Sequence, residues 1–364
     1  MPLYVALQNL KGEVNVDIHN PAQTDGFEFV EYTAPDTQNL ELLFLSMGFT
    51  AVARHRSKDV TLYRQGDVNF IINHEPDSFA QAFAKIHGPS VCAFGIRVKD
   101  ASKALDYVLA RNAKPYQGHT GPMELNIPAI QGIGGSLIYL IDRYGEQSIY
   151  DVDFRPINNV VQYPKGVGLR GIDHLTHNVH PGRMNQWAEF YERLFNFSQI
   201  KYFDIKGQET GLKSRAMTSP CGKIRIPINE PSDNKSQIQE YLDAYHGEGI
   251  QHIALSTDNI YETVESLKRN NVTFMDVPDS YYDMINSRIP GHKEDIDRLR
   301  ENRILIDGFV QNRQELLLQI FTTTVIGPIF FEIIQRKGNE GFGEGNFQAL
   351  FESIELDQKR RGIL

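Results

Sequence analysis

The 364-residue chain has little cysteine, no long hydrophobic run and no excess of positive charge. Its two cysteines can form at most one bridge, which excludes a disulfide scaffold and favours a reducing compartment. The formal net charge of −9 disfavours binding to nucleic-acid phosphates. No apolar stretch approaches the roughly 18 residues of a membrane span, and the first residues do not resemble a signal peptide. We therefore expect a cytoplasmic protein that binds neither nucleic acid nor a membrane.

The composition is that of an ordinary globular protein. Hydrophobic residues make up 41% of the chain and charged residues 23%, so a sizeable core can be buried. At about 100–200 residues per domain, the length predicts two or three domains. Short strands alternate with amphipathic helices except over residues 151–168, which carry proline and glycine without periodicity. We therefore predict a linker there, with domains over 1–155 and 156–364.

An internal repeat runs through the sequence. Three segments of the first half align, without gaps and in the same order, with three segments of the second half. The aligned pairs are 26–32 with 171–177, 90–111 with 248–269, and 133–143 with 326–336. One such match can arise by chance, but three in order indicate a duplicated module.

The repeat also shows where the two halves differ. At three matched strand positions the second half carries His174, His252 and Glu332, whereas the first half carries an aromatic residue at each. The aromatic counterparts are, in the same order, Phe29, Phe94 and Tyr139. The second half is therefore predicted to hold a site that the first half has lost.

Two histidines and one carboxylate on apolar strand faces point to a metal site. The residues two places before and after His252 and Glu332 are all apolar, and strand alternation puts them on the same face. A carboxylate is almost never fully buried without a partner or a metal. Two imidazoles and a carboxylate are the ligand set of non-haem Fe(II) oxygenases, and Zn²⁺ uses the same set. Residue types alone do not choose between these metals.

Each of these residues also has an ordinary structural interpretation. A single histidine on a strand is more often a hydrogen-bonded core residue than a ligand, and Glu332 has Arg336 within reach as an ion-pair partner. The coincidence of all three with the repeat favours the metal site. His177 lies three residues after His174 and therefore on the opposite strand face, so we expect a structural role for it.

Eight motifs in the second half resemble, in order, those of the 4-hydroxyphenylpyruvate dioxygenase family. They are IDHLTHNV, YFDIKG, IRIPINEP, SQIQEYL, GEGIQHIAL, LLQIFT, FFEIIQRKG and the stretch that begins GFGEGNF. The resemblance covers about 170–364, and the first half fits the family's N-terminal domain more loosely. It implies an α+β vicinal-oxygen-chelate (glyoxalase-like) fold, in which tandem βαβββ modules form two open-barrel domains.

The resemblance implies that Fe(II) is bound by His174, His252 and Glu332, the residues that the repeat also selects. It further implies a substrate pocket formed by Ser214, Asn229, Gln237, Gln251, Gln319, Phe321, Phe330, Phe342, Gly343, Asn346 and Phe347. Neighbouring strand residues point to opposite faces, so Gln251 and His252 can serve one site only if the strand is irregular. The glycine-rich stretch and an amphipathic helix predicted over 346–361 are expected to gate the pocket. No catalytic residue beyond the ligands and the pocket is expected.

The resemblance also implies a reaction. 4-Hydroxyphenylpyruvate, a small-molecule 2-oxo acid, and O2 are converted to homogentisate and CO2 in tyrosine and phenylalanine catabolism, without a separate 2-oxoglutarate. The nearest alternative is 4-hydroxymandelate synthase, which acts on the same substrate. A Zn²⁺ or Ni²⁺ isomerase or hydrolase and a non-enzymatic small-molecule binding protein of the same fold are further alternatives. Family members form dimers or tetramers, so we expect a homodimer or homotetramer.

Overall fold

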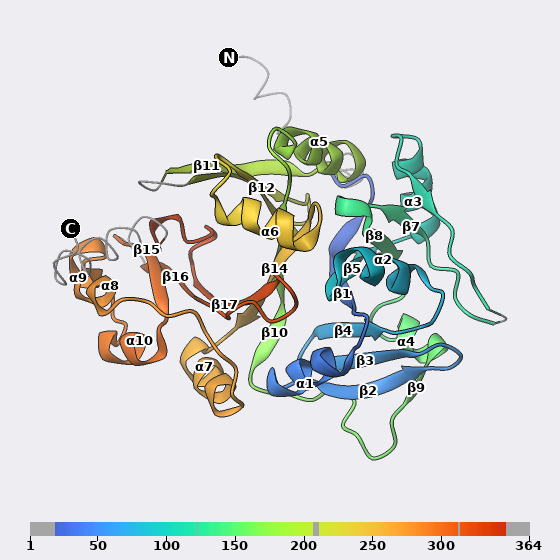
Figure 1. Ribbon diagram of the computed structural model, residues 1–364, viewed down its shortest axis with the longest axis horizontal. Helices are drawn as coiled ribbons and strands as arrows, with labels where there is room; N and C mark the ends of the chain where they lie inside the picture. Colours follow the sequence, from blue (N-terminus) through green and yellow to red (C-terminus); the bar gives the residue numbers. More distant parts are fainter. Residues whose placement is uncertain (1–18, 122, 207–210, 312–313, 347–364) are drawn as a thin grey trace, which may run out of the picture.

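The computed structural model describes residues 19–121, 123–206, 211–311 and 314–346, which form two curled sheets side by side (Figure 1). Strand order is β6-β7-β8-β5-β1-β4-β3-β2-β9 in the nine-stranded sheet and β11-β12-β13-β10-β14-β17-β16-β15 in the eight-stranded sheet. Each sheet contains two successive βαβββ units. β1, β5 and β10 are each followed by one α-helix and three strands, and β14 is followed by four helices and three strands. The predicted fold of tandem βαβββ modules is therefore confirmed.

The first sheet lies within the first half of the chain. Its strands are β1 (Thr24–Thr33), β2 (Thr50–His55), β3 (Val60–Gln65), β4 (Val68–Asn73), β5 (Ser90–Val98), β6 (Pro115–Tyr116), β7 (Ala129–Gln131), β8 (Leu137–Ile141) and β9 (Phe154–Pro156). The helical segments are α1 (Gln38–Ser46), α2 (Phe79–His87), α3 (Ala101–Leu109), η2 (Ile133–Gly135) and α4 (Ile149–Asp153). The division into domains stays a prediction, and β9 ends at Pro156, one residue past the predicted boundary.

The second sheet repeats this arrangement with longer insertions. Its strands are β10 (Leu169–Asn178), β11 (Ser198–Lys206), β12 (Gly211–Thr218), β13 (Arg225–Pro231), β14 (Gly249–Thr257), β15 (Leu305–Val310), β16 (Gln314–Phe321) and β17 (Phe330–Lys337). The helices are α5 (Met184–Phe195), α6 (Gln237–Tyr245), α7 (Ile260–Arg269), α8 (Asp279–Asp283), α9 (Ile285–Arg288) and α10 (Ile296–Asn302). Among the described residues, no helix has both the length and the apolar character needed to cross a membrane.

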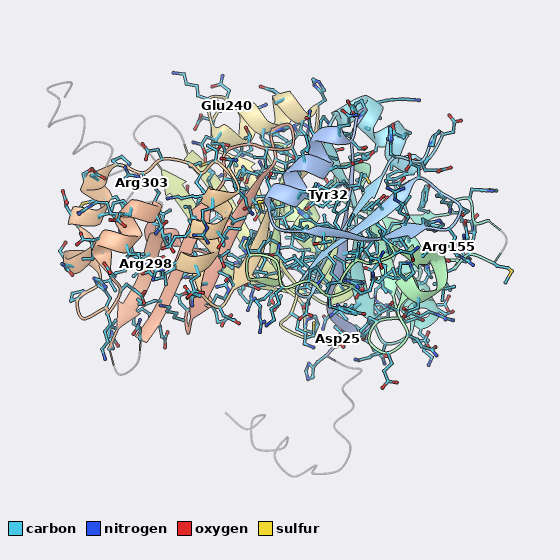
Figure 2. The ribbon with its side chains drawn as sticks, turned by 90° about the horizontal axis from the view of Figure 1, so that it is seen from below. Asp25, Tyr32, Arg155, Glu240, Arg298 and Arg303 are labelled. Atoms are coloured by element: carbon cyan, nitrogen blue, oxygen red, sulfur yellow. The ribbon has the colours of Figure 1, made fainter. Side chains whose placement is uncertain are left out.

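The two halves share one hydrophobic core. The central strands β1 and β5 are buried along nearly their whole length, as expected for strands covered on both faces. Rings from the two halves meet in this core, where Phe70 stacks on Phe331 with 5.9 Å between centroids. At its edge lies Asp25, which is labelled in Figure 2. Asp25 accepts hydrogen bonds from Lys99 and from Lys223 of the second half. Burial raises the pKa of Asp25, but these bonds outweigh it and hold that pKa at about 2.

Strand register corrects one match of the repeat. Thr176 of β10 pairs with His252, whereas Glu31, the residue that the repeat aligns with Thr176, pairs with Ala93. The first-half counterpart of His252 is therefore Ala93, and the match with Phe94 is wrong by one residue. The reason is that β1 and β5 pair with several bulges, and an ungapped sequence alignment takes no account of bulges.

The other two matches agree with the strand register. Phe29 pairs with Gly95, which in turn pairs with Tyr139. In the second half, His174 and Glu332 flank a single residue of β14 in the same way. Phe29 and Tyr139 are therefore the spatial counterparts of His174 and Glu332, as the repeat predicts.

Candidate metal centre and substrate pocket

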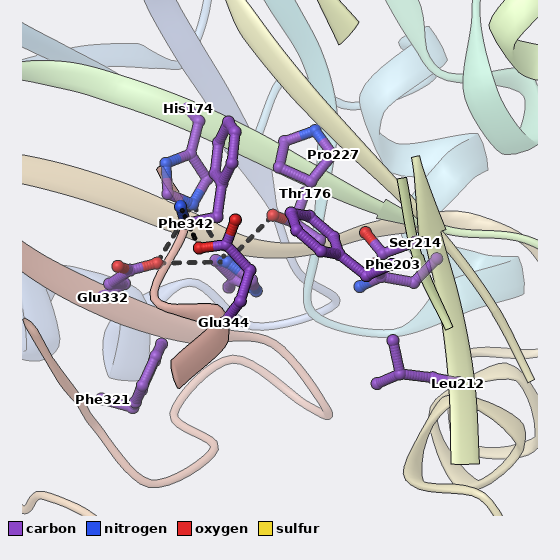
Figure 3. A pocket seen from close by; sticks show the side chains of 12 residues that line it. His174, Thr176, Phe203, Leu212, Ser214, Pro227, Phe321, Glu332, Phe342 and Glu344 are labelled. Atoms are coloured by element: carbon purple, nitrogen blue, oxygen red, sulfur yellow. Dashed lines mark hydrogen bonds and ion pairs between the residues drawn. The ribbon is translucent and has the colours of Figure 1, made fainter. Parts of the chain in front are cut away.

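Three adjacent strands bring the predicted metal ligands together. In the second sheet β14 lies between β10 and β17, so each ligand comes from a different strand. Ala254 of β14 pairs with His174 on one side and with Glu332 on the other. His252 lies two residues earlier on β14 and therefore on the same face as Ala254. All three ligand side chains thus converge on one side of the sheet, and Figure 3 labels two of them, His174 and Glu332.

The distances between the ligand atoms fit a single metal ion. His174 Nε2 lies 3.0 Å from Glu332 Oε2 and 3.3 Å from His252 Nε2, and His252 Nε2 lies 3.4 Å from Glu332 Oε2. Bonds of about 2.1 Å at right angles to one another would separate neighbouring ligand atoms by about 3.0 Å. Glu332 Oε1 is buried and has no hydrogen-bond partner among the described residues. These residues can therefore hold a metal ion.

Each histidine is oriented by the residue that precedes it. His174 Nδ1 lies 2.8 Å from Asp173 Oδ1, and His252 Nδ1 lies 3.1 Å from Gln251 Oε1. Both Asp173 and Gln251 are skipped in the pairing of β10 with β14, so each sits in a β-bulge. The bulges let two consecutive side chains reach the same site, which a regular strand does not allow. With hydrogen on both Nδ1 atoms, the Nε2 lone pairs face the metal position.

Buried charges stabilise this arrangement. Arg336 donates to both oxygens of Asp173, with Nε to Oδ2 and Nη2 to Oδ1 each at 2.8 Å, so it pairs with Asp173 rather than with Glu332. Burial alone raises the pKa of Asp173, but Arg336 and His174 hold that pKa far below its usual range. Burial also opposes the charge of Glu332, yet His174 lowers the pKa of Glu332 to about 2. Burial lowers the pKa of His252.

The ligands open into a pocket with about 490 Å³ of empty space, part of which is open to solvent. Ser214 of β12 and Asn229 of β13 line it and are paired in the strand register. The full lining is His174, Thr176, Phe203, Leu212, Ser214, Pro227, Asn229, His252, Phe321, Glu332, Phe342 and Glu344 (Figure 3). The pocket is mostly aromatic and apolar apart from the ligands and a few polar groups.

Aromatic rings pack directly against the two imidazoles. Phe330 stacks on His252 with 4.9 Å between ring centroids, and Phe321 approaches the same ring edge-on at 6.3 Å. Phe342 meets His174 edge-on at 5.3 Å. These contacts restrict the imidazoles to one orientation and shield the metal position from water.

Comparison with known proteins identifies the family. The family model described as "Hydroxyphenylpyruvate dioxygenase, HPPD, N-terminal" matches residues 18–155. The model of the Glyoxalase/Bleomycin resistance protein/Dioxygenase superfamily matches residues 171–285. The 4-hydroxyphenylpyruvate dioxygenase of Pseudomonas aeruginosa is 58% identical over 96% of this chain and 98% of its own length. The chain belongs to the 4-hydroxyphenylpyruvate dioxygenase family.

One further sequence relative and one solved structure are also similar to this chain. Hemolysin VllY of Vibrio vulnificus is 63% identical over 96% of this chain and 99% of its own length. A solved structure of a 4-hydroxymandelate synthase mutant from Streptomyces coelicolor superimposes with a TM-score of 0.79, over 92% of this chain and 99% of its own. At 24% sequence identity, this neighbour shows the shared fold alone. The vicinal-oxygen-chelate fold is thereby confirmed for this dioxygenase-family chain.

The structure places some of the predicted substrate residues of this family member away from the pocket. Gln251 contacts the His252 ring and is not part of the pocket lining. Gln237 is the first residue of α6, where its side chain is exposed and outside the lining. Phe347 and nearly all of the predicted C-terminal helix lie outside the described residues. Motif matching supplied these residues without information on where their side chains point.

Gln319 and Gly343 form a close contact behind the pocket. Gln319 is 1% exposed, and a Cβ atom at position 343 would lie only 1.9 Å from its Oε1. Gly343 also has a φ of +79°, a conformation that favours glycine. The glycine is therefore required by the close approach of the backbone to Gln319, and it brings the preceding Phe342 to His174.

Residues 339–346, the C-terminal segment, are anchored at both ends. Arg336 Nη1 donates to two carbonyl oxygens of the segment, at 3.1 and 2.6 Å. At the other end Asn346 is 1% exposed, and its Oδ1 accepts a 2.6 Å hydrogen bond from the Tyr281 hydroxyl. The arginine that pairs with Asp173 thus also positions the segment that carries Phe342.

Sequence reasoning missed several residues of the site. Thr176 Oγ1 lies 2.9 Å from His252 Nε2, and its position two residues after His174 was a usable signal. Glu344 lines the pocket and forms an ion pair with Lys201 of β11. The ion pair of Glu344 with Lys201 joins residues that lie far apart in the chain, so no local sequence pattern predicts it.

Proposed function

We propose that this chain is an Fe(II)-dependent dioxygenase that converts 4-hydroxyphenylpyruvate and O2 to homogentisate and CO2 in tyrosine and phenylalanine catabolism. The observation that carries the proposal is the convergence of His174, His252 and Glu332 at one end of an aromatic pocket. Two imidazoles and a carboxylate are the ligand set of non-haem Fe(II) oxygenases. The 58% identity to a relative named as this dioxygenase supports the substrate.

The three ligands would hold Fe(II) through the two Nε2 atoms and the Glu332 carboxylate. When bound, Fe(II) supplies the electrons for O2 chemistry and a template for the 2-oxo acid. The side chains of Asp173 and Gln251 keep a proton on each Nδ1, so that both Nε2 atoms stay free to bind the metal. The carboxylate and the keto oxygen of the substrate would therefore lie at the end of the pocket where His174, His252 and Glu332 meet.

The rest of the pocket would bind the aromatic ring of the substrate. Phe321 and Phe342 would pack around it and exclude water from the reacting atoms. Phe330 lies outside the pocket lining, and we propose that it contributes by packing against Phe321 and His252. Ser214 and Asn229 would hydrogen-bond the phenol hydroxyl. Asn229 Nδ2 lies 3.3 Å from Asn178 Oδ1, which restrains the amide. A site built to bind a hydroxyl rejects analogues that lack it.

The experiment adds 4-hydroxyphenylpyruvate to the Fe(II)-loaded protein without oxygen, then admits O2 and identifies the product. We expect a charge-transfer absorption band before O2 and homogentisate with CO2 after it. His174→Ala and Glu332→Ala should remove both the band and O2 consumption. His180→Ala, a control at an exposed histidine after β10, should retain both. Turnover by either ligand variant would refute the proposed site.

The same experiment separates the rival functions. Hydroxymandelate as product would make the chain a 4-hydroxymandelate synthase, whose fold it shares. Turnover with Zn²⁺ or Ni²⁺ and no need for O2 would indicate an isomerase or hydrolase. Binding of the 2-oxo acid without any turnover would indicate a binding protein. We also propose a cytoplasmic homodimer or homotetramer, which sedimentation of the purified chain would test.

A further inference from the structure

The first half contains an open cavity of its own, with about 830 Å³ of empty space, part of which is open to solvent. Its walls carry aromatic rings from β1, β6 and β8, those of Phe29, Tyr116 and Tyr139. Phe29 and Tyr139 lie 5.8 Å apart between centroids. Polar and charged residues also line it, among them Glu31 of β1, Asn73 of β4 and Lys58. The proposed reaction does not use this cavity.

The strand register makes this cavity the counterpart of the substrate pocket. Phe29 and Tyr139 take the places of His174 and Glu332, as described above. Tyr32 pairs with Ile72, so Asn73 follows at the level where Asn178 pairs with Asn229 in the second half. Val60 pairs with Asn73 in the way that Ser214 pairs with Asn229. The first half has therefore kept the shape of a ligand pocket while losing the metal ligands.

The charged groups of the two pockets differ. The second-half pocket would hold a metal ion that suits an anionic 2-oxo acid, whereas the first-half cavity has the Glu31 carboxylate where the second half has Thr176. Glu31 is 7% exposed, and its Oε1 accepts a 2.7 Å hydrogen bond from Asn73 Nδ2. Among the described residues, no cation forms an ion pair with it.

The other acidic groups of the cavity already have cationic partners. Lys58 pairs with Glu124 at 2.7 Å, and Arg56 lies 3.7 Å from Asp153. Burial raises the pKa of Glu31 and outweighs the charge of Lys58, which lowers that pKa without forming an ion pair with Glu31. A ligand that brings a positive charge would supply the missing partner, because a buried carboxylate is costly without one.

We propose that the first-half cavity is a second binding site, for a small aromatic amine. The ammonium group would pair with Glu31 and hydrogen-bond it, and the ring would pack against Phe29, Tyr116 and Tyr139. Aromatic faces attract a cation as well as an aromatic ring. Anionic aromatic acids, which suit the metal pocket, would be repelled from this one.

Calorimetric titration of the full, metal-loaded chain with 2-phenylethylamine tests this site. The neutral 2-phenylethanol and the anionic phenylacetate serve as matched ligands of similar shape. We expect saturable binding of the amine, binding of the alcohol weaker by about tenfold or more, and no binding of phenylacetate in this cavity. Absence of amine binding, or equal binding of amine and alcohol, would overturn the proposal.

Variants locate the binding. Glu31→Gln, which keeps the side-chain shape, should remove the preference for the amine over the alcohol. Val60→Phe, which fills the cavity without changing a charge, should remove binding of both. Glu332→Gln, the matched change in the other barrel, should leave amine binding intact. Amine binding that survives the first two variants, or that competes with 4-hydroxyphenylpyruvate in turnover, would refute a first-half site.

Discussion

Asp173→Asn tests whether the buried ion pair holds the metal site together. The variant keeps the size of the side chain but removes the carboxylate that pairs with Arg336, at a side chain only 12% exposed. Removing one partner of a buried ion pair costs about 3–5 kcal/mol of unfolding free energy. Arg336 retains its two hydrogen bonds to the C-terminal segment, so we expect about 3 kcal/mol, at the low end.

The same variant should also weaken metal binding. Asparagine can turn its amide NH2 toward the His174 ring, which would move the ring hydrogen to Nε2, the metal-binding atom. Loss of such a partner typically reduces metal affinity by about 10- to 100-fold. Urea unfolding of the metal-free protein measures the stability change, and competition with a chelator measures the affinity for Fe(II).

A matched control separates this effect from general loss of charge. Asp258 pairs with Arg170 at 3.0 Å, but its side chain is 79% exposed. Asp258→Asn should change the unfolding free energy by less than about 1 kcal/mol and leave metal affinity unchanged. If Asp173→Asn loses stability but binds metal like the unmodified chain, Asp173 is only an ion-pair partner. If neither property changes, the inferred coupling is wrong.

Three other outcomes follow from the structure. Asp25→Asn should lower stability at neutral pH; because the pKa of Asp25 falls from 3.8 to about 2 on folding, this difference should shrink between pH 4 and pH 2 in acid-unfolding curves. Gly343→Ala should place a methyl group against Gln319, and turnover assays should show lost activity while chelator competition shows retained metal binding. Asn229→Ala should raise KM for 4-hydroxyphenylpyruvate more than for phenylpyruvate, which lacks the hydroxyl, and equal changes would count against the assigned phenol contact.

The sequence was sufficient to predict the group of three residues that the structure brings together, because duplication leaves a local trace. His174 and Glu332 stand on strands whose first-half copies carry Phe29 and Tyr139, and strand register agrees with both matches. The βαβββ architecture could be predicted for the same reason, together with the family motifs. These features depend on residue type and spacing within single strands.

The features that could not be predicted depend on contacts between distant segments or on irregular strands. The bulge at Asp173 turns that carboxylate to His174, and no feature of the sequence reveals a bulge there. Because of the bulges between β1 and β5, the sequence repeat predicts Phe94 as the first-half counterpart of His252, whereas the strand register gives Ala93. The exposed position of Gln237 follows from how α6 packs, which a motif match does not describe.

The position of Ala254 between two candidate metal ligands gives a reason for the carboxylate to be a glutamate. Its strand separates the backbones of His174 and Glu332, so these backbones stand two strand spacings apart, about 9.6 Å. The imidazole and the carboxylate have to reach over the alanine methyl group and meet above it. An aspartate is one methylene shorter and would stop short of the meeting point. The spacing between the strands therefore determines how long a side chain must be to reach the metal position.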